Sequence, residues 1–194
     1  MTSPRAICVF CGSSNDVNPQ LLEAARELGR DAARRGIAIV FGGGRVGLMG
    51  ALADGALAEG GEVTGIIPEH LQAQEVAHNG LSELIVVDSM HTRKRRMFDL
   101  SDAFCVLPGG MGTLDETFEI LTWRQLGLHD KPVIVVNVNG FWDPLLKLFE
   151  HQIDTGFIRP RDTRLLRVVE RVASVFDALA EARAPGIAAD TERL

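Results

Sequence analysis

Cysteine, long apolar runs and an excess of basic charge are all scarce in this sequence of 194 residues. No run of 18 apolar residues occurs, which leaves no candidate transmembrane helix. Lys and Arg number 20 against 26 Asp and Glu, and a general nucleic-acid binder would need the opposite balance. The N-terminal residues also lack a signal-peptide pattern. We therefore expect a cytoplasmic protein with neither nucleic acid nor membrane as a partner.

The three cysteines, Cys8, Cys11 and Cys105, give an odd number and no disulfide framework. The spacing Cys8-x-x-Cys11 is that of a redox motif, but such a motif stands at the start of a helix. Here Cys8 lies inside an apolar strand and Cys11 precedes a Gly-Ser-Ser turn. Two further zinc ligands at a suitable spacing are not apparent. We expect reduced thiols in or near the core and no metal site.

The hydrophobic content of 46% and the charged content of 24% are those of a globular protein, and the length suits one α/β domain. Short β-branched runs alternate with amphipathic segments along most of the chain. This alternation predicts a doubly wound, mostly parallel sheet with helices on both faces, a Rossmann-like fold. We expect residues 1–183 to form this single domain and residues 184–194 to form a loose tail.

The predicted strands cover residues 6–10, 37–41, 63–67, 84–87, 103–107, 133–138 and 165–169. The predicted helices cover 19–35, 47–58, 91–100, 113–126, 142–154 and 172–182, and residues 68–81 are expected to be irregular. In a doubly wound sheet, the ligand lies beyond the carboxyl ends of the strands. The loops at 12–15, 42–47 and 108–113 should therefore meet at one edge of the protein.

The first glycine-rich loop, Gly42-x-Gly44-x-x-Gly47, follows a strand and opens a helix, as a dinucleotide fingerprint does. Helix N–H groups and the helix dipole attract a phosphate in such a loop. The acidic residue expected after the next strand is missing, and the absence of Gly-Lys-Ser/Thr excludes a P-loop. Two interpretations stay open: a phosphate loop with Ser14, Gly43 and Gly44 as contacts, or tight turns with close helix packing.

The second glycine-rich loop runs from Pro108 to Glu116 at another predicted strand-to-helix junction. Its three glycines and a hydroxyl predict a nest of N–H donors at a helix start. Thr113-x-x-Glu116 is also a capping box, in which Glu116 would reach back to cap the helix. A basic run lies before this loop. Arg93 and Lys94 stand at a predicted helix start, where cations oppose the dipole, and so indicate an anion nearby.

These motifs resemble a known family. Met90-His91-x-Arg93-Lys94-x-x-Met97, followed by Pro108-Gly109-Gly110-x-Gly112-Thr113-x-x-Glu116, is similar to the paired signature of the Lonely Guy (LOG) family. Its members are cytokinin-activating phosphoribohydrolases, long mislabelled as lysine decarboxylases. The resemblance covers about residues 6–158. It implies a Rossmann-like homodimer that cleaves N6-substituted AMP, and often AMP itself, to a free base and ribose 5-phosphate. The sequence shows neither a metal cluster nor the context of a pyridoxal phosphate lysine, so we expect hydrolysis without a cofactor.

The resemblance also implies roles for individual residues. Arg93 and Glu116 would be the catalytic pair. The implied substrate contacts are Glu75, Arg93, Lys94, Gly110, Met111, Gly112, Thr113, Leu114, Asp115, Glu116 and Thr122. Glycosidic cleavage passes through an oxocarbenium-like state that a carboxylate can stabilise while it activates water. An adjacent arginine can hold the phosphate or ribose and keep that carboxylate ionised.

Two alternatives stay open at this point. The first is a non-catalytic nucleotide or molybdenum-cofactor carrier of related fold, which would bind a nucleotide and release no base. The second is a dinucleotide oxidoreductase, which the missing ribose-binding acid disfavours.

Overall fold

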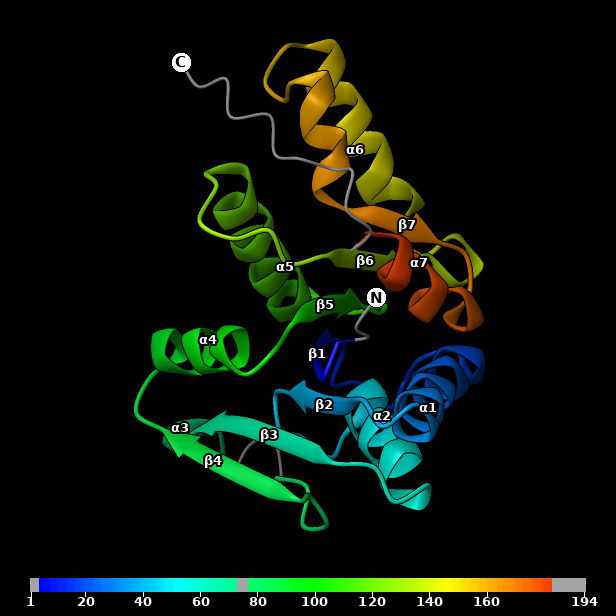
Figure 1. Ribbon diagram of the computed structural model, residues 1–194, viewed down its shortest axis with the longest axis vertical. Helices are drawn as coiled ribbons and strands as arrows, with labels where there is room; N and C mark the ends of the chain where they lie inside the picture. The colour runs from blue at the N-terminus through cyan, green and yellow to red at the C-terminus, as the bar shows by residue number, and fades with distance from the viewer. Residues whose placement is uncertain (1–3, 73–76, 183–194) are drawn as a thin grey trace.

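The computed structural model describes residues 4–72 and 77–182 (Figure 1). Within these residues, seven parallel strands form one sheet in the order β4-β3-β2-β1-β5-β6-β7. The strands are β1 (Ala6–Phe10), β2 (Ala38–Phe41), β3 (Val63–Pro68), β4 (Glu83–Val87), β5 (Ala103–Val106), β6 (Val133–Val136) and β7 (Arg167–Val169). The predicted Rossmann-like parallel sheet is confirmed.

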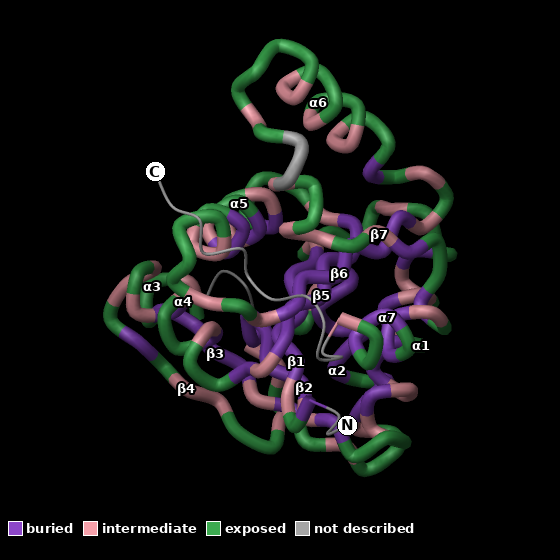
Figure 2. Tube along the Cα trace, turned by 45° about the horizontal axis from the view of Figure 1, so that its top comes forward, coloured by how far each residue is buried: buried purple, intermediate pink, exposed green. Residues whose placement is uncertain are grey.

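Helices connect the strands and cover both faces of the sheet (Figures 1 and 2). They are α1 (Pro19–Arg34), α2 (Gly47–Ala58), α3 (Glu69–Gln72), α4 (Met90–Asp99), α5 (Met111–Gln125), α6 (Asp143–Asp154) and α7 (Val175–Ala182), with 3-10 turns η1 (Val138–Gly140), η2 (Pro160–Leu165) and η3 (Val172–Ser174). Side chains of α1, α2 and α7 share one core cluster with alternate residues of the central strands. Side chains of α4, α5 and α6 pack on the opposite face.

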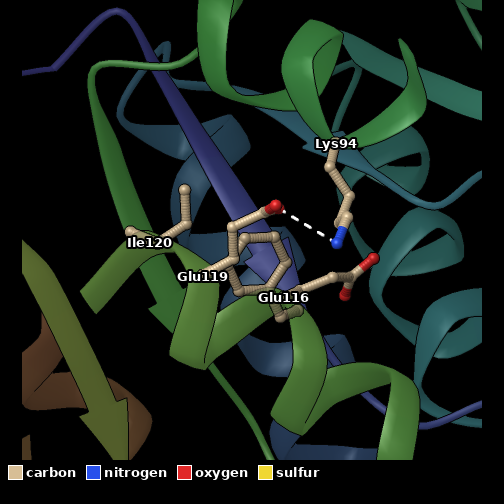
Figure 3. A pocket seen from close by; sticks show the side chains of 5 residues that line it. Lys94, Glu116, Glu119 and Ile120 are labelled. Atoms are coloured by element: carbon tan, nitrogen blue, oxygen red, sulfur yellow. Dashed lines mark ion pairs between the residues drawn. The ribbon is translucent and has the colours of Figure 1, made fainter. Parts of the chain in front are cut away.

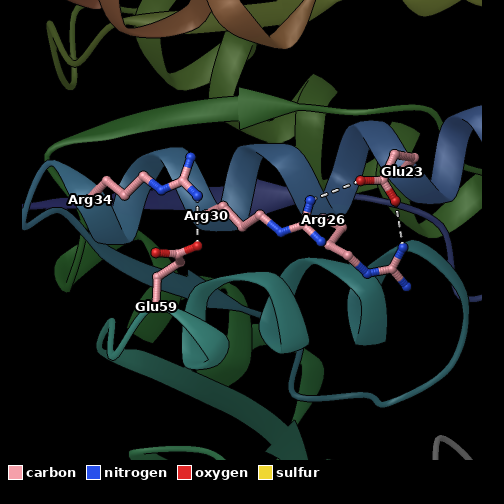
Figure 4. Close-up of polar contacts among 5 residues, drawn as sticks. All are labelled: Glu23, Arg26, Arg30, Arg34 and Glu59. Atoms are coloured by element: carbon pink, nitrogen blue, oxygen red, sulfur yellow. Dashed lines mark hydrogen bonds and ion pairs between the residues drawn. The ribbon is translucent and has the colours of Figure 1, made fainter.

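Glycines allow α1 and α2 to pack at unusually close range. A Cβ atom at Gly29 of α1 would overlap the carbonyl oxygen of Leu52 in α2, and one at Gly55 would overlap that of Arg26. The outer sides of the pair carry surface ion pairs, Glu23 with Arg26 (2.7 Å) and Arg30 (3.0 Å), and Arg34 with Glu59 (2.7 Å) (Figure 4). Exposed pairs of this kind contribute little, so close backbone packing holds the two helices together.

Several predicted boundaries are wrong. Helix α5 begins at Met111 rather than at residue 113, because tertiary packing overrides the low helix propensity of Gly112. Residues 165 and 166 precede β7, because the 3-10 turn η2 occupies the chain up to Leu165. The segment at 68–81 was expected to be irregular, yet Pro68 pairs with β4 and α3 follows it. Residues 184–194 lie outside the described residues.

The cysteines are buried, as the sequence predicts. Burial raises the pKa of Cys105 to about 12 and raises the pKa of Cys8 and Cys11 as well. These thiols therefore stay protonated and unreactive at neutral pH. Among residues 4–72 and 77–182, no cluster of His, Cys, Asp or Glu side chains could hold a metal ion. The same part of the chain contains no helix that is both long and apolar enough to span a bilayer.

Candidate functional site

The loops after β1, β2 and β5 meet at the carboxyl edge of the sheet, as the topology predicts. Strand β1 lies between β2 and β5, so its loop touches both neighbours. The backbone N–H of Gly12 donates to the carbonyl oxygen of Pro108 (3.0 Å). A Cβ atom at Gly12 would lie 3.2 Å from the Cα atom of Gly109. The first and third loops are therefore packed backbone against backbone.

The glycine-rich loop before α2 serves packing. Its helix N-terminus is satisfied within the chain, because the N–H of Gly47 donates to Oδ1 of Asn15 (2.8 Å). The next two helix amides both donate to the carbonyl oxygen of Gly12 (3.0 and 3.3 Å). Gly47, at φ +67°, lies so close to Ser14 that a Cβ atom there would be 2.5 Å from its backbone nitrogen. The donors at this helix start are thus already used.

The other expected contacts of the first loop are also held by the protein. Gly43 and Gly44 are buried, and the carbonyl oxygen of Gly43 accepts from the N–H of His78 (3.0 Å). Ser14 is exposed, and its hydroxyl accepts from the N–H of Asp16 (3.2 Å). These contacts support the interpretation of the loop as tight turns with close helix packing.

The N-terminus of α5 is open by comparison. Gly110 is the N-cap residue and provides no side-chain cap, and the first bonded amide is that of Leu114, which donates to the carbonyl oxygen of Gly110 (3.0 Å). The amides of Met111, Gly112 and Thr113 have no acceptor among the described residues. A Cβ atom at Gly110 or Gly112 would meet nothing within 4 Å. This end of α5 therefore carries three N–H donors and the positive end of the helix dipole, next to the open space in front of Gly110 and Gly112.

The interpretation of Glu116 as a helix cap is wrong. A capping box needs Thr113 at the N-cap and Glu116 at the third helical position. The N-cap is Gly110, so Thr113 is itself the third helical residue and Glu116 is the sixth. Thr113 is buried, and a Cβ atom at Gly109 would collide with its hydroxyl oxygen. Packing of Thr113 under Gly109 sets the helix start, so Thr113 and Glu116 do not form a capping box.

Arg93 is the buried cation of the site. Helix α4 starts after Ser89, whose hydroxyl accepts from the N–H of Thr92 (3.1 Å), and this turn directs Arg93 toward the sheet. The side chain is buried, with 5% of the residue exposed. Its Nε donates to the carbonyl oxygen of Ile66 (3.1 Å) and its Nη2 to that of Gly42 (3.0 Å). A Cβ atom at position 42 would collide with Nη2, so Gly42 makes room for the guanidinium.

Lys94, the next residue of α4, reaches across to α5 and pairs with two carboxylates there. Its Nζ lies 3.1 Å from Oδ2 of Asp115 and 3.1 Å from Oε2 of Glu119. Burial alone would lower the pKa of Lys94, but the hydrogen bonds to both carboxylates raise it above its ordinary value. Lys94 is therefore a fixed cation that ties α4 to α5.

A shallow hollow lies between α4 and α5. It is lined by Phe10, Lys94, Glu116, Glu119 and Ile120, and Figure 3 shows both glutamates and the lysine converging on it. The charge of Glu116 also affects the pKa of two buried thiols, those of Cys8 and Cys11. After burial, its charge is the largest cause that raises the pKa of Cys8 and Cys11, whereas the charge of Arg93 lowers that of Cys8. The charges of Glu116 and Arg93 thus act in opposite directions on the pKa of Cys8 in β1.

The structure brings together most residues that the family resemblance implies. Residues 110–116 form the start of α5, where Leu114 is partly buried against the core, and Lys94 pairs with Asp115 there. Arg93 precedes Lys94 on α4. Thr122 is exposed and eleven residues past Met111, about 16 Å along the helix axis and on a different side from Glu116. One chain alone does not join Thr122 to the others. Glu75 lies outside the described residues.

Sequence reasoning missed one residue of this site and one packing residue of the neighbouring loop. Glu119 lines the hollow and holds Lys94, and its spacing of three from Glu116 on a predicted helix was a usable signal. Asn15 satisfies the start of α2, a contact across 32 residues that no local pattern indicates.

Comparisons with known proteins agree on one family. A family model described as "possible lysine decarboxylase" matches residues 49–179. A protein of Rhodococcoides fascians named cytokinin riboside 5′-monophosphate phosphoribohydrolase is 49% identical over 159 residues, 81% of this chain and 80% of that protein. The Arabidopsis thaliana protein of that name, LOG7, is 44% identical over 162 residues, 84% of this chain and 75% of its own length.

Solved structures share the fold at lower identity. The molybdenum cofactor carrier protein of Chlamydomonas reinhardtii superposes with a TM-score of 0.69 at 23% identity, over 91% of this chain and 96% of that chain. The molybdenum cofactor binding protein of Rippkaea orientalis has the same TM-score at 22% identity, over 93% and 98% of the two chains. At this identity the likeness extends to the fold alone.

Substitution of two neighbouring glycines separates packing from binding at α5. Gly112→Val adds a side chain in open space, so the free energy of unfolding should change by less than about 1 kcal/mol. AMP binding should be lost, because the side chain covers the exposed amides. Gly109→Ala should instead lower the unfolding free energy by about 1–3 kcal/mol, because its Cβ atom meets Thr113. Urea denaturation and calorimetric titration with AMP measure both quantities. Unfolding of Gly112→Val without a specific loss of binding would contradict the assignment.

Proposed function

This chain belongs to the Lonely Guy family, and we propose that it hydrolyses the N-glycosidic bond of AMP-type nucleotides to a free base and ribose 5-phosphate. It is an enzyme of the phosphoribohydrolase type. The substrates we propose are N6-prenylated AMP, AMP or both, in the cytoplasm. The observation that carries the proposal is the open N-terminus of α5 beside the carboxylate of Glu116.

The 5′-phosphate would bind the amides of Met111, Gly112 and Thr113. A helix N-terminus with three donors and no cap is a ready anion site. The N-terminus of α2 offers no equal site, because Asn15 and Gly12 already accept from its first amides. The phosphate therefore favours α5 over the first glycine-rich loop, and Ser14, Gly43 and Gly44 support the site through packing.

Glu116 follows the phosphate donors by little more than one helical turn, about 7.5 Å along the axis from Met111. From there its carboxylate can activate a water molecule and stabilise the positive charge that develops on the sugar ring. The water adds to the anomeric carbon while the bond to the base nitrogen breaks, and the base leaves with a proton. Water is the only co-reactant that this step needs.

Arg93 would keep the Glu116 carboxylate ionised from its buried position at the sheet. Two of its nitrogens are committed to the carbonyl oxygens of Ile66 and Gly42, so the guanidinium is held in one place. A fixed positive charge close to Glu116 favours the ionised carboxylate and orients it. Because this charge is preorganised, it costs no rearrangement in the transition state.

The first test compares AMP with adenosine. If the start of α5 binds the phosphate, AMP should be cleaved with a kcat/KM at least about 100-fold higher, because a 5′-hydroxyl leaves the charge-binding amides unpaired. Chromatography of the released adenine gives both rates, with isopentenyl-AMP as a second substrate. Equal turnover of AMP and adenosine would contradict the phosphate assignment, and AMP binding without release of any base would favour a carrier.

The second test removes the charge of Glu116. Glu116→Gln should fold normally and bind AMP, but should lose about 100-fold or more in turnover, because the amide cannot serve as a base. Arg93→Ala should lose turnover too. If the two residues act as a unit, the double variant should fall by less than the product of the single losses. Near-normal release of adenine by Glu116→Gln would refute the mechanism.

A homodimer would explain the position of Thr122. Met111, Phe118 and Leu126 are exposed and lie with Thr122 along one side of α5. In an antiparallel contact of two α5 helices around Phe118, Met111 would face Leu126 of the partner subunit. Thr122 of the partner subunit would then lie opposite Asp115, next to the phosphate donors. A twofold axis there would also bury the apolar side chains.

Mixed dimers test this arrangement. Glu116→Gln and Thr122→Val should each lower turnover in homodimers. Coexpressed with different tags and purified as a heterodimer, the two variants should regain activity, because one of the two sites then contains neither substitution. Light scattering confirms the mass of the dimer. A monomer, or a heterodimer without any recovery, would contradict a shared site.

A further inference from the structure

The ion pair between Lys94 and Glu119 is not needed to bind the phosphate or to activate water. Lys94 is close to three carboxylates, those of Asp115, Glu116 and Glu119, which surround it on one side of α5. The local charge is therefore negative and would repel a phosphate. It favours neutral groups that can both donate and accept hydrogen bonds.

The position of the pair corresponds to the sugar. Along α5, Asp115, Glu116 and Glu119 follow Met111 by about 6, 7.5 and 12 Å. Glu116 and Glu119 are three residues apart on one helix face and line the same hollow. With the phosphate at the helix start and the anomeric carbon near Glu116, the ribose ring lies over this hollow. This placement rests on the proposed function.

The chemistry of the pair matches a diol. The ammonium of Lys94 has three donors, and within the described part of the chain two are directed at carboxylates, which leaves one for a ligand. Glu119 has one oxygen on Lys94 and a second that can accept. A donor and an acceptor side by side are complementary to two neighbouring hydroxyls. The only neighbouring hydroxyls of a nucleoside monophosphate are the 2′ and 3′ groups of its ribose.

We propose that Lys94 and Glu119 bind the ribose diol and make this enzyme selective for ribonucleotides over 2′-deoxyribonucleotides. Hydrogen bonds to the 2-hydroxyl strengthen in the transition state of glycoside hydrolysis, so the contact raises kcat as well as affinity. A deoxyribose leaves the pair without its partner. The glycosidic bond of a deoxyribonucleotide is intrinsically the weaker one, because no electron-withdrawing 2′-oxygen opposes the cation. A preference for ribose must therefore come from the protein.

The experiment compares AMP with 2′-deoxy-AMP in three forms of the enzyme. The wild type should favour AMP by about 100-fold or more in kcat/KM. Glu119→Ala should lose about 10- to 100-fold on AMP and little on 2′-deoxy-AMP, so that the preference collapses. Asp115→Asn is the matched control, because it removes the negative charge of the other carboxylate that pairs with Lys94. The side chain of Asp115 is 56% exposed and does not line the hollow. Its AMP preference should persist.

Other variants and ligands keep the test decisive. Glu119→Gln retains an acceptor oxygen and should restore part of the preference that Glu119→Ala loses. Calorimetry with ribose 5-phosphate and 2-deoxyribose 5-phosphate measures the same selectivity without turnover. Failure to cleave AMP, with selective Glu119-dependent binding of ribose 5-phosphate, would refute the proposed function and support the diol site. Cleavage of AMP and 2′-deoxy-AMP with equal losses in Glu119→Ala would overturn the diol site alone, as would collapse of the preference in Asp115→Asn.

Discussion

The buried guanidinium of Arg93 is the interaction on which the site depends. Burial of a cation costs several kcal/mol unless hydrogen bonds compensate it, and here the backbone carbonyls of Gly42, just after β2, and of Ile66, within β3, accept from it. These bonds fix α4 against the sheet edge. They also place the following residue, Lys94, where it reaches α5. Gly42 belongs to the same arrangement, since any side chain there would occupy the space of the guanidinium.

The two glycine-rich loops look alike in sequence and differ in what their glycines do. In the first loop, glycines let backbones approach, and the start of α2 is closed by the chain itself. In the second loop, the missing side chain of Gly109 leaves room for the hydroxyl group of Thr113, while Gly110 and Gly112 border open space. A glycine that touches nothing in the protein leaves room for a ligand. This difference separates a packing loop from a candidate phosphate site.

Helix α5 then carries successive functions along one axis. Its first amides have no acceptor within residues 4–72 and 77–182, its second turn carries Glu116, and its third carries Glu119. A nucleotide aligned with such a helix would meet anion donors, then a catalytic carboxylate, then the proposed diol contact. The anion-binding amides lie at the first turn of α5 and the carboxylates at later turns, so the phosphate does not have to bind next to a like charge of Glu116 or Glu119. A rigid helix also keeps their spacing constant, which suits a site that must match a transition state.

The sequence by itself determined the parallel sheet, the edge at which the loops meet and the family, because apolar runs, glycine spacing and paired motifs are local patterns. It also predicted Arg93, Lys94 and Glu116 as site residues. The start of α5 at Met111 is visible only in the folded chain, because it depends on Thr113 packing against Gly109. This start excludes a capping box between Thr113 and Glu116. Tertiary structure alone joined Gly42 to Arg93 across 51 residues and Lys94 to Asp115 across 21. It also separated Thr122 from the site within one chain. Contacts between segments distant in the chain leave no period or spacing in the sequence, so only the folded chain reveals them.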